Sequence, residues 1–329
     1  MSYKDFPKIE LHHHLEGAAP PALVRDMARA RGMDVSSIFD AEGAYSYRDF
    51  LQFLDVYEKA TRPFSSPDDY ALLLAVVAGE AAEQGVVYLE TFLAPDFCGG
   101  RDPGAWKDYL AAMIEAAASA EQLGITLRGI VTAVRHAGAE AARETAACAQ
   151  ETAGDFIVGF GMGGDENAGD TSDFAYAFDM AREAGLRLTS HAGEWAGPAS
   201  VRASLTDLGV ERIGHGVRAI EDETLVAELA DKGIVLEVCP GSNVALGVYP
   251  SWEAHPIARL RQAGVKVTVS TDDPPFFHTN MTREFEELER AFGWDAGDFA
   301  ALNRVALDAA FCDDATREVI AKRLEPADA

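Results

Sequence analysis

Three consecutive histidines lie near the N-terminus, in the run Ile9-Glu10-Leu11-His12-His13-His14-Leu15-Glu16-Gly17. If this run is a β-strand, its side chains alternate between two faces, so His12 and His14 share one face and His13 points the other way. Two imidazoles on one face can bind a single metal ion, because neutral imidazole is a common ligand of zinc and related divalent metals. The run alone is equally compatible with an ordinary His-rich patch. A metal site therefore needs further ligands from elsewhere in the chain.

Other polar clusters follow short apolar runs further along the chain. They occupy residues 161–166, 190–194, 214–216 and 270–274. Taken singly, a histidine at a strand end is usually structural, and an Asp-Asp-Pro sequence is usually a turn. Their joint occurrence, each at the end of a predicted strand, indicates one shared site instead.

The third histidine and the carboxylate that a metal site would need are both present in these clusters. His191 and Asp272 each follow a predicted strand, so they would join His12 and His14 if those strands end at a common face. Three histidines and one aspartate are typical of a catalytic mononuclear site that keeps a position for water.

The elements that must position these residues alternate between short apolar runs and helical stretches. Continuous apolar runs indicate strands buried on both faces, hence a parallel sheet. Eight strand–helix units predict an α/β fold of the TIM-type (β/α)8 barrel class, with a doubly wound sheet as the alternative. The predicted strands span residues 9–15, 86–93, 126–134, 156–162, 186–191, 212–215, 234–239 and 265–271.

The connections are unequal in length. Residues 20–66 form a long insertion after the first strand, with helical patterns at 24–31 and 47–60, which we expect to lie as extra helices over the barrel mouth. Residues 282–323 are predicted to be helical and to pack on the outside. With no internal repeat or linker, we expect residues 1–329 to form a single domain.

Composition excludes several classes of protein. The chain has 329 residues, 48% of them hydrophobic, and a net charge of −26, which disfavours binding to nucleic acid or anionic membranes. It has no apolar run long enough to span a membrane and no N-terminal signal pattern. Its four scattered cysteines are typical of reduced thiols. We therefore expect a soluble, cytoplasmic protein; its oligomeric state is not predicted.

Two motif matches are rejected. Residues 159–164 match the Gly-x-Gly-x-x-Gly dinucleotide fingerprint, but Asp165 and Glu166 follow in place of a helix start, and their charges would repel a pyrophosphate. His14-Leu15-Glu16 matches the His-x-Glu of zinc deaminases that act on cytidine, but the Pro-Cys-x-x-Cys sequence that this fold requires is absent.

The set of motifs resembles the adenosine/adenine deaminase branch of the amidohydrolase superfamily. Most of the chain, from residue 7 to about 287, carries the resemblance, and the motifs occur in the family's order. They are His-x-His-Leu-x-Gly, Gly-Asp-Glu, His-Ala-Gly-Glu, Arg-Ile-Gly-His-Gly, Cys-Pro-x-Ser-Asn and Thr-Asp-Asp-Pro. The resemblance implies a (β/α)8 barrel, one zinc ion per chain and hydrolytic deamination of a 6-aminopurine.

The resemblance also implies residue roles. Zinc would be bound by His12, His14, His191 and Asp272. Glu194 would protonate the purine N1, for which its carboxyl group must stay protonated in a closed, apolar site.

The remaining roles concern the water and the purine. His215 would orient the metal-bound water and help to deprotonate it. Asp273 would hydrogen-bond N7, and the backbone N–H of Gly164 would meet N3. His14 and Glu16 would also lie at the substrate, the family's acid at the position of Glu16 being close to the ribose hydroxyls.

The substrate within this class is open. The Gly-Asp-Glu form at residues 164–166 favours adenosine or deoxyadenosine, whereas Glu16, where adenosine deaminases usually have Asp, favours adenine or a modified nucleoside. We expect adenosine, with adenine as the alternative. Two other functions compete: a two-metal amidohydrolase, which the absence of lysine from residues 156–166 disfavours, and a silent purine-binding barrel, which intact Glu194 and His215 disfavour.

Overall fold

The computed structural model describes residues 3–325, whose strands form one eight-stranded sheet. Each strand pairs in parallel with the next strand in the sequence. Parallel neighbours need crossover connections, which the intervening helices supply, and this gives the predicted TIM-type barrel. The strands are β1 (Lys8–Glu10), β2 (Val86–Leu93), β3 (Thr126–Val134), β4 (Ile157–Gly163), β5 (Arg187–Ala192), β6 (Arg212–His215), β7 (Val235–Val238) and β8 (Lys266–Val269).

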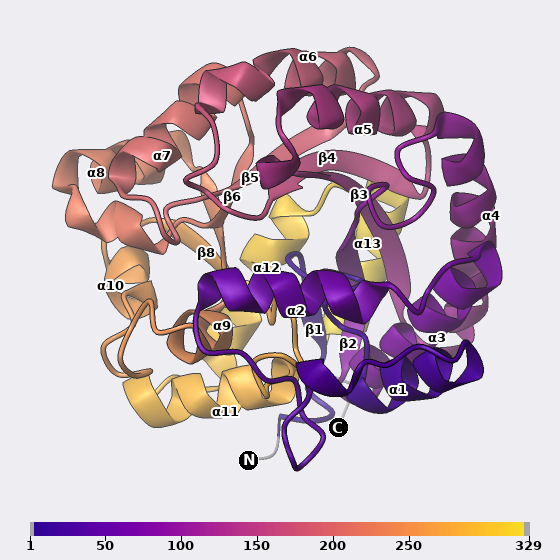
Figure 1. The fold of residues 1–329 in the computed structure, drawn as a ribbon. Coiled ribbons are helices and arrows are strands. Elements are labelled where there is room, and N and C mark those ends of the chain that lie inside the picture. Colours follow the sequence, from indigo (N-terminus) through magenta and orange to yellow (C-terminus); the bar gives the residue numbers. More distant parts are fainter. Residues whose placement is uncertain (1–2, 326–329) are drawn as a thin grey trace.

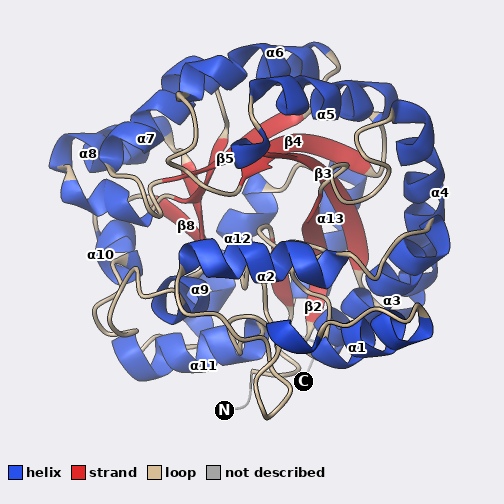
Figure 2. Cartoon of the chain, in the orientation of Figure 1, coloured by secondary structure: helices blue, strands red, loops and turns tan. Residues whose placement is uncertain are grey.

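Helices surround the strands, which lie at the centre of the molecule (Figure 1 and Figure 2). Short 3₁₀ or π turns adjoin several of them, such as η5 (Ser204–Leu208) at the end of α7. The helices are α1 (Pro21–Ala30), α2 (Phe50–Thr61), α3 (Pro67–Glu83), α4 (Pro103–Ala120), α5 (Ala139–Thr152), α6 (Ala175–Glu183), α7 (Pro198–Ala203), α8 (Glu223–Lys232), α9 (Pro240–Ala245), α10 (Ile257–Gln262), α11 (Met281–Phe292), α12 (Ala296–Ala309) and α13 (Asp314–Leu324).

The first strand is shorter than the predicted 9–15, because β1 ends at Glu10. Just beyond it, the backbone N–H groups of Leu11 and His12 donate to the hydroxyl of Ser270, at 3.3 and 3.2 Å. A side chain thus takes the place of a strand carbonyl, and the regular ladder stops there.

Backbone pairing resumes at two isolated bridges, His13 with Asp272 and His14 with Phe92. The N–H of His14 donates to the carbonyl of Asp272 at 3.0 Å, and the N–H of Asp272 donates to the carbonyl of His12 at 3.1 Å. These bonds join the segments that follow the first and last strands. The barrel is therefore closed at the level of the histidines.

The insertion after β1 lies over the barrel mouth, as predicted. Figure 1 shows α2 crossing in front of the strands. This helix begins at Phe50 because the Asp49 side chain accepts a hydrogen bond from the backbone N–H of Gln52, which is a standard N-cap. Its inner face then directs Phe53 and Tyr57 towards the barrel.

The prediction that all of residues 282–323 pack on the outside is wrong for the last two helices. Figure 1 shows α12 and α13 behind the strands, at the end opposite α2. Ala306 and Ala310 pack there against Ile9 and Leu11. Asn303 also accepts a hydrogen bond from the backbone N–H of Ile9 at 3.1 Å. These helices close the end of the barrel where the strands begin. They bury the apolar side chains at the N-terminal ends of the strands, which would otherwise be exposed to solvent.

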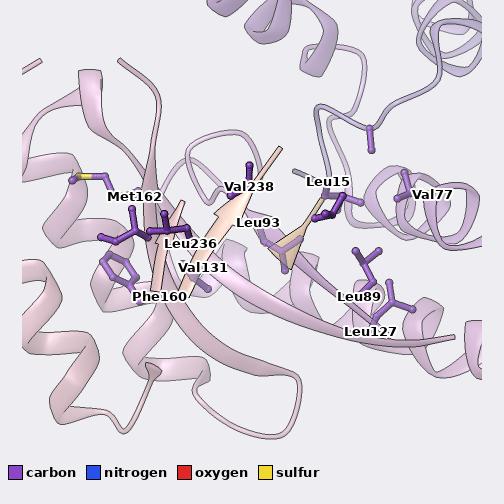
Figure 3. Close-up of a cluster of buried hydrophobic side chains, with 14 of the residues drawn as sticks. Leu15, Val77, Leu89, Leu93, Leu127, Val131, Phe160, Met162, Leu236 and Val238 are labelled. Carbon is purple, nitrogen blue, oxygen red and sulfur yellow. The ribbon is translucent and has the colours of Figure 1, made fainter. Parts of the chain in front are cut away.

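The hydrophobic core fills the layer between strands and helices. Along β2, Leu89 and Leu93 belong to this layer, which Figure 3 shows in close-up, while Glu90 and Phe92 alternate with them. Residues two apart on a strand share a face, so the alternation separates an apolar outer face from an inner face that carries polar groups. Glu237 on β7 follows the same rule between two outward-facing apolar residues.

Over residues 3–325, none of the helices has the length and apolarity needed to cross a bilayer. The four cysteines are free and buried, as predicted: Cys98, Cys148, Cys239 and Cys312.

Candidate metal centre and active site

Four side chains from three segments converge at the mouth of the barrel. His12 and His14 follow β1, His191 lies in β5, and Asp272 follows β8. Each offers one ligand atom, and these atoms lie within 4.8 Å of one another. The Nε2 atom of His191 is 3.1 Å from that of His12 and 3.2 Å from that of His14, and the Oδ1 atom of Asp272 is 3.4 and 3.3 Å from the same two nitrogens.

The orientation of these rings suits a cation between them. The Nδ1 atom of His191 lies 2.9 Å from the carbonyl oxygen of Met162, which can only accept, so this nitrogen bears the proton. The Nδ1 atom of His12 lies 2.8 Å from the carboxylate of Glu237. The Nε2 lone pairs of both rings therefore face each other. A divalent metal resolves this repulsion, and the outer acceptors hold the rings in the orientation that metal binding requires.

His13 points away from this centre, as alternation predicts. Its Nδ1 atom lies 3.2 Å from the hydroxyl of Thr91, and its ring is buried against the outer layer. Burial lowers the pKa of His13 to about 3, so the ring is neutral. It belongs to the structure around the site, not to the ligand set.

Glu194 and His215 lie beside the ligand set. The Oε2 atom of Glu194 is 3.7 Å from the Nε2 atom of His215, and both side chains are buried. Burial, the charge of Asp272 and the charge of Glu166 together raise the pKa of Glu194 well above its usual value. This shift favours the protonated carboxyl group, the form that can act as an acid.

Two of these residues have backbone conformations that side chains rarely adopt. His215 has φ 60° and Asp272 has φ 67°. The left-handed region is uncommon for residues other than glycine, and such residues concentrate at functional sites. The strain turns both side chains towards the cavity at the ends of β6 and β8.

The turn that carries Glu194 is held by a second buried acid, Glu166. Its carboxylate accepts hydrogen bonds from the backbone N–H groups of residues 193, 194, 195 and 196, at 2.6 to 3.0 Å. The hydroxyl of Ser200 donates to it as well, at 2.9 Å. The sequence identified Glu166 only as part of Gly-Asp-Glu. Its position after a glycine pair at a strand end is the signal that could have assigned it a role.

A cavity of about 360 Å³ opens beside the ligand set. The predicted substrate-binding residues all line it, namely Glu16, Gly164 and Asp273, together with His14. Gly164 has φ 99°, and a Cβ there would lie 2.7 Å from the Nδ1 atom of His136. Glycine therefore keeps the backbone of residue 164 accessible from the cavity.

Asp273 is the cavity residue whose carboxylate is least satisfied. Its Oδ1 atom is buried and has no hydrogen-bond partner among the described residues. Burial, with the neighbouring charges of Asp272, Glu194 and Glu16, raises the pKa of Asp273 well above its usual value. A buried polar atom without a partner is costly, and a ligand in the cavity can supply one.

Glu16 also lines the cavity. It accepts hydrogen bonds from the hydroxyl of Tyr70 and the backbone N–H of Ala94, both at 3.4 Å. Burial raises the pKa of Glu16 to about 7, so its charge varies near neutral pH.

Sequence reasoning missed the roles of helix α9. It identified Cys-Pro-x-Ser-Asn as a family motif but gave the serine and the asparagine no roles, whereas Ser242 donates to the Oδ2 atom of Asp272 at 2.7 Å. Asn243 donates to Glu194 at 3.3 Å and contacts the Nδ1 atom of His215 at 3.4 Å. Two buried polar residues after a strand end were the available signal.

The rejected dinucleotide motif lies within β4, and residues 164–170 after it form turns and bends in place of a helix. No phosphate-binding helix start is present there, in agreement with its rejection.

Comparison with known proteins shows to which family of amidohydrolases the chain belongs. The sequence profile of the family described as adenosine deaminase matches residues 7–327. This chain belongs to the adenosine/adenine deaminase family. A relative from Chelativorans sp. (strain BNC1), named adenine deaminase, is 48% identical over 322 residues, which cover 97% of this chain and 98% of the relative.

Solved structures of the family agree in fold. The crystal structure of adenine deaminase from Arthrobacter aurescens has a TM-score of 0.89 at 28% identity, covering 97% of this chain and 98% of that one. An amidohydrolase from Burkholderia ambifaria, solved with bound Zn, has a TM-score of 0.85 at 26% identity, covering 98% and 93%. The protein is a metal-dependent aminohydrolase of this family and deaminates an adenine-type purine.

Proposed function

We propose that the chain is a zinc-dependent adenine deaminase, which converts adenine and water into hypoxanthine and ammonia. The observation that carries the choice of adenine is the near-full-length identity, 48% and 47%, to two relatives named adenine deaminase. The sequence led us to expect adenosine, and these relatives favour the alternative instead. The zinc assignment is supported by the buried His/His/His/Asp set and by the bound Zn of a related structure.

The ligands of the proposed metal are His12, His14, His191 and Asp272. Zinc held there would act as a Lewis acid that makes hydroxide available near neutral pH.

The protein residues would activate the purine. C6 is a weak electrophile while the ring is aromatic, and protonation of N1 by Glu194 would relieve this. A water oxygen then bonds to C6 as one of its protons restores the Glu194 carboxyl group. The remaining hydroxyl proton passes to the amino nitrogen, the bond from C6 to that nitrogen breaks, and ammonia leaves with a C6 carbonyl in its place. The raised pKa of Glu194 supports this role, since only a protonated carboxyl group can give N1 its proton.

Residues of the cavity would also bind the purine, by matching its hydrogen-bond donors and acceptors. The purine N7 is an acceptor, so it needs a donor, and a protonated Asp273 with a free Oδ1 would provide one. The backbone N–H of Gly164 would meet N3. Free adenine has an N9–H that nucleosides lack, and Glu16, an acceptor on the cavity wall, would bind it.

Adenosine remains a second candidate, because a cavity of about 360 Å³ has room for more than a nucleobase. Ammonia release should therefore be measured with adenine, adenosine and deoxyadenosine, with metal analysis on the same sample. We expect the highest kcat/KM for adenine. Protein holding about one zinc that turned over no 6-aminopurine would refute the deaminase proposal, and a preference for adenosine would refute the choice of substrate.

Glu16 provides the sharper test of specificity. Replacement Glu16→Gln keeps the size of the side chain and removes its charge, so we expect kcat/KM for adenine to fall by roughly tenfold, the cost of one hydrogen bond to a charged group. The ratio of adenine to adenosine activity should fall with it. An unchanged ratio would show that Glu16 does not contact N9.

A further inference from the structure

A buried chain of hydrogen bonds runs from helix α10 to both proposed catalytic groups, through His255 and Asn243. The Ile257 backbone N–H donates to the Nδ1 atom of His255 at 3.2 Å. The Nε2 atom of His255 lies 3.1 Å from the Oδ1 atom of Asn243. The amide nitrogen of Asn243 then lies 3.3 Å from Glu194 Oε1 and 3.4 Å from His215 Nδ1.

The direction of every bond in this chain follows from its first member. A backbone N–H can only donate, so the Nδ1 atom of His255 must carry a lone pair. His255 is thus neutral, its proton is on Nε2, and Nε2 donates to Asn243. Burial agrees, because it lowers the pKa of His255 to about 3. The Asn243 oxygen must then face His255, and its NH₂ group must face Glu194 and His215.

We propose that His255 and Asn243 are positioning residues that fix which atom of each catalytic group bears its proton. The two N–H bonds of the Asn243 amide require acceptors on both sides. His215 Nδ1 must be unprotonated, so its proton lies on Nε2. Glu194 Oε1 accepts from the same amide, which favours Oε2 as the oxygen that bears an acid proton. The Oδ2 atom of Asp272, 3.9 Å from His215 Nε2, is compatible with the same choice for His215.

The consequence for the reaction is that two protons face the same space. His215 Nε2 and Glu194 Oε2 are 3.7 Å apart and border the cavity. With the polarity set by Asn243, His215 presents an N–H to the incoming water, and Glu194 presents an O–H to the purine. His215 would therefore orient the water by donating to it, and the proton that the water loses would pass to the Glu194 carboxylate once Glu194 has protonated N1. This revises the role that the family resemblance implies for His215.

This inference rests on the proposed deaminase function for its catalytic meaning, but its direct test does not involve a substrate. Zinc-loaded protein labelled with ¹⁵N-histidine reports the protonated ring nitrogen of each histidine in two-bond ¹H–¹⁵N spectra. We assign the His215 signals by their loss in His215→Gln. The expected result is a proton on Nε2 of His215 and of His255. A proton on Nδ1 of His215 would overturn the proposal, whatever the substrate proves to be.

Variants of Asn243 test the consequence. In Asn243→Asp the amide donor becomes an acceptor, so His215 should move its proton to Nδ1. We expect kcat to fall by about 10³- to 10⁴-fold, as it does when a catalytic histidine is held in the wrong tautomer, with KM changed by less than about threefold. Metal content should stay at about one per chain. Loss of metal in proportion to activity, or unchanged kcat, would overturn the proposal.

Two variants of His255 form a matched pair. They test the proposal independently, in case the Asn243 variant does not fold. His255→Gln keeps a donor at the Nε2 position and should stay within about fivefold of the original kcat, whereas His255→Leu removes the donor and should lose about 10- to 100-fold. Tyr249→Phe serves as a control, because Tyr249 packs on the His255 ring, with ring centroids 5.1 Å apart, without joining the chain. Equal losses for Gln and Leu would show a packing role and contradict the inference.

Discussion

Burial controls the chemistry of Glu194 and Asp273, the two acids that border the cavity beside the metal ligands. Desolvation is the largest cause of the raised pKa of each, and the neighbouring carboxylates add to it. The shift favours the neutral, donating form of both groups, which suits a purine ring whose nitrogens N1 and N7 are acceptors. A site with several acids thus binds a ligand that offers mainly lone pairs.

Glu194→Gln should separate chemistry from metal binding. The amide keeps the size of the side chain but cannot give up a proton, so we expect kcat to fall by about 10²- to 10⁴-fold. Zinc content, measured by elemental analysis, should be unchanged, because Glu194 is outside the ligand set. A variant that loses its metal would show that Glu194 has a different role.

Gly17→Ala should disable substrate binding through Asp273. A Cβ at residue 17 would lie 1.5 Å from the Oδ1 atom of Asp273, so the carboxyl group must move. We expect kcat/KM to fall at least about tenfold, the effect of one lost hydrogen bond to a ligand.

A matched control is Gly79→Ala in the middle of α3, where a Cβ would meet nothing within 4 Å. This change should leave kcat/KM unaltered, since alanine is the better helix former. Equal activity of the two variants would contradict the placement of Asp273 against the purine.

At the scale of elements, the turn after β5 depends on a single carboxylate. Glu166→Gln keeps one acceptor oxygen but puts an NH₂ group where the Glu166 carboxylate accepts N–H donors, so the turn at residues 193–196 should loosen. We expect kcat to fall by about 10- to 100-fold, because loss of a hydrogen bond to a charged group costs roughly 1.5–3 kcal/mol, and metal content should not change.

Asp165→Asn removes the same charge one residue away, where the Asp165 side chain accepts from Asn167 in the same turn. Its kcat should stay close to the original value. If both variants lost activity equally, the effect would be electrostatic and would not come from the turn.

The elements were largely predictable, because the period of apolar residues reports which faces are buried. The strands from β2 to β8 lie within about three residues of the predicted ranges. The end of β1 was not predictable, since it depends on the Ser270 hydroxyl, which comes from the other end of the chain. The cover formed by α12 was missed for a similar reason: apolar periodicity shows that a helix is buried on one side but not against what.

The candidate site could likewise be predicted only in part from the sequence. His191 and Asp272 could be proposed from the sequence because strand ends of a barrel meet at one face. The contacts of Glu237 with His12 and of Asn243 with Glu194 could not, because they depend on side-chain orientation across strands that are far apart in sequence.

At the scale of the whole molecule, stability should fall as pH rises through neutrality. Burial raises the pKa of Glu284 to about 8, and Glu284 contacts Thr279 and Gly241 away from the ligand set. The folded state therefore holds a proton that the unfolded state releases above its ordinary pKa of about 4.5, so the free energy of unfolding decreases between those two values. Thermal unfolding between pH 5 and about 9 should show this decrease.

Glu284→Gln imitates the protonated acid and should flatten that dependence. Its amide can donate to Thr279 and accept from the N–H of Gly241. The variant should match the original protein at pH 5 and exceed it in Tm at about pH 8. Parallel curves for the two proteins would mean that Glu284 does not carry the buried proton.

The bridge between His13 and Asp272 gives the metal a further effect, on the connectivity of the folded chain. Two ligands follow the first strand and one follows the last, so a bound ion acts as a cross-link between segments about 260 residues apart, which restricts the unfolded chain as a long-loop cross-link does. Metal binding and barrel closure are then thermodynamically coupled, so each stabilises the other. Chelation should speed amide hydrogen exchange first at His14 and Asp272, while the β2–β3 ladder keeps its protection; uniform acceleration would show that the ion stabilises the barrel without closing it.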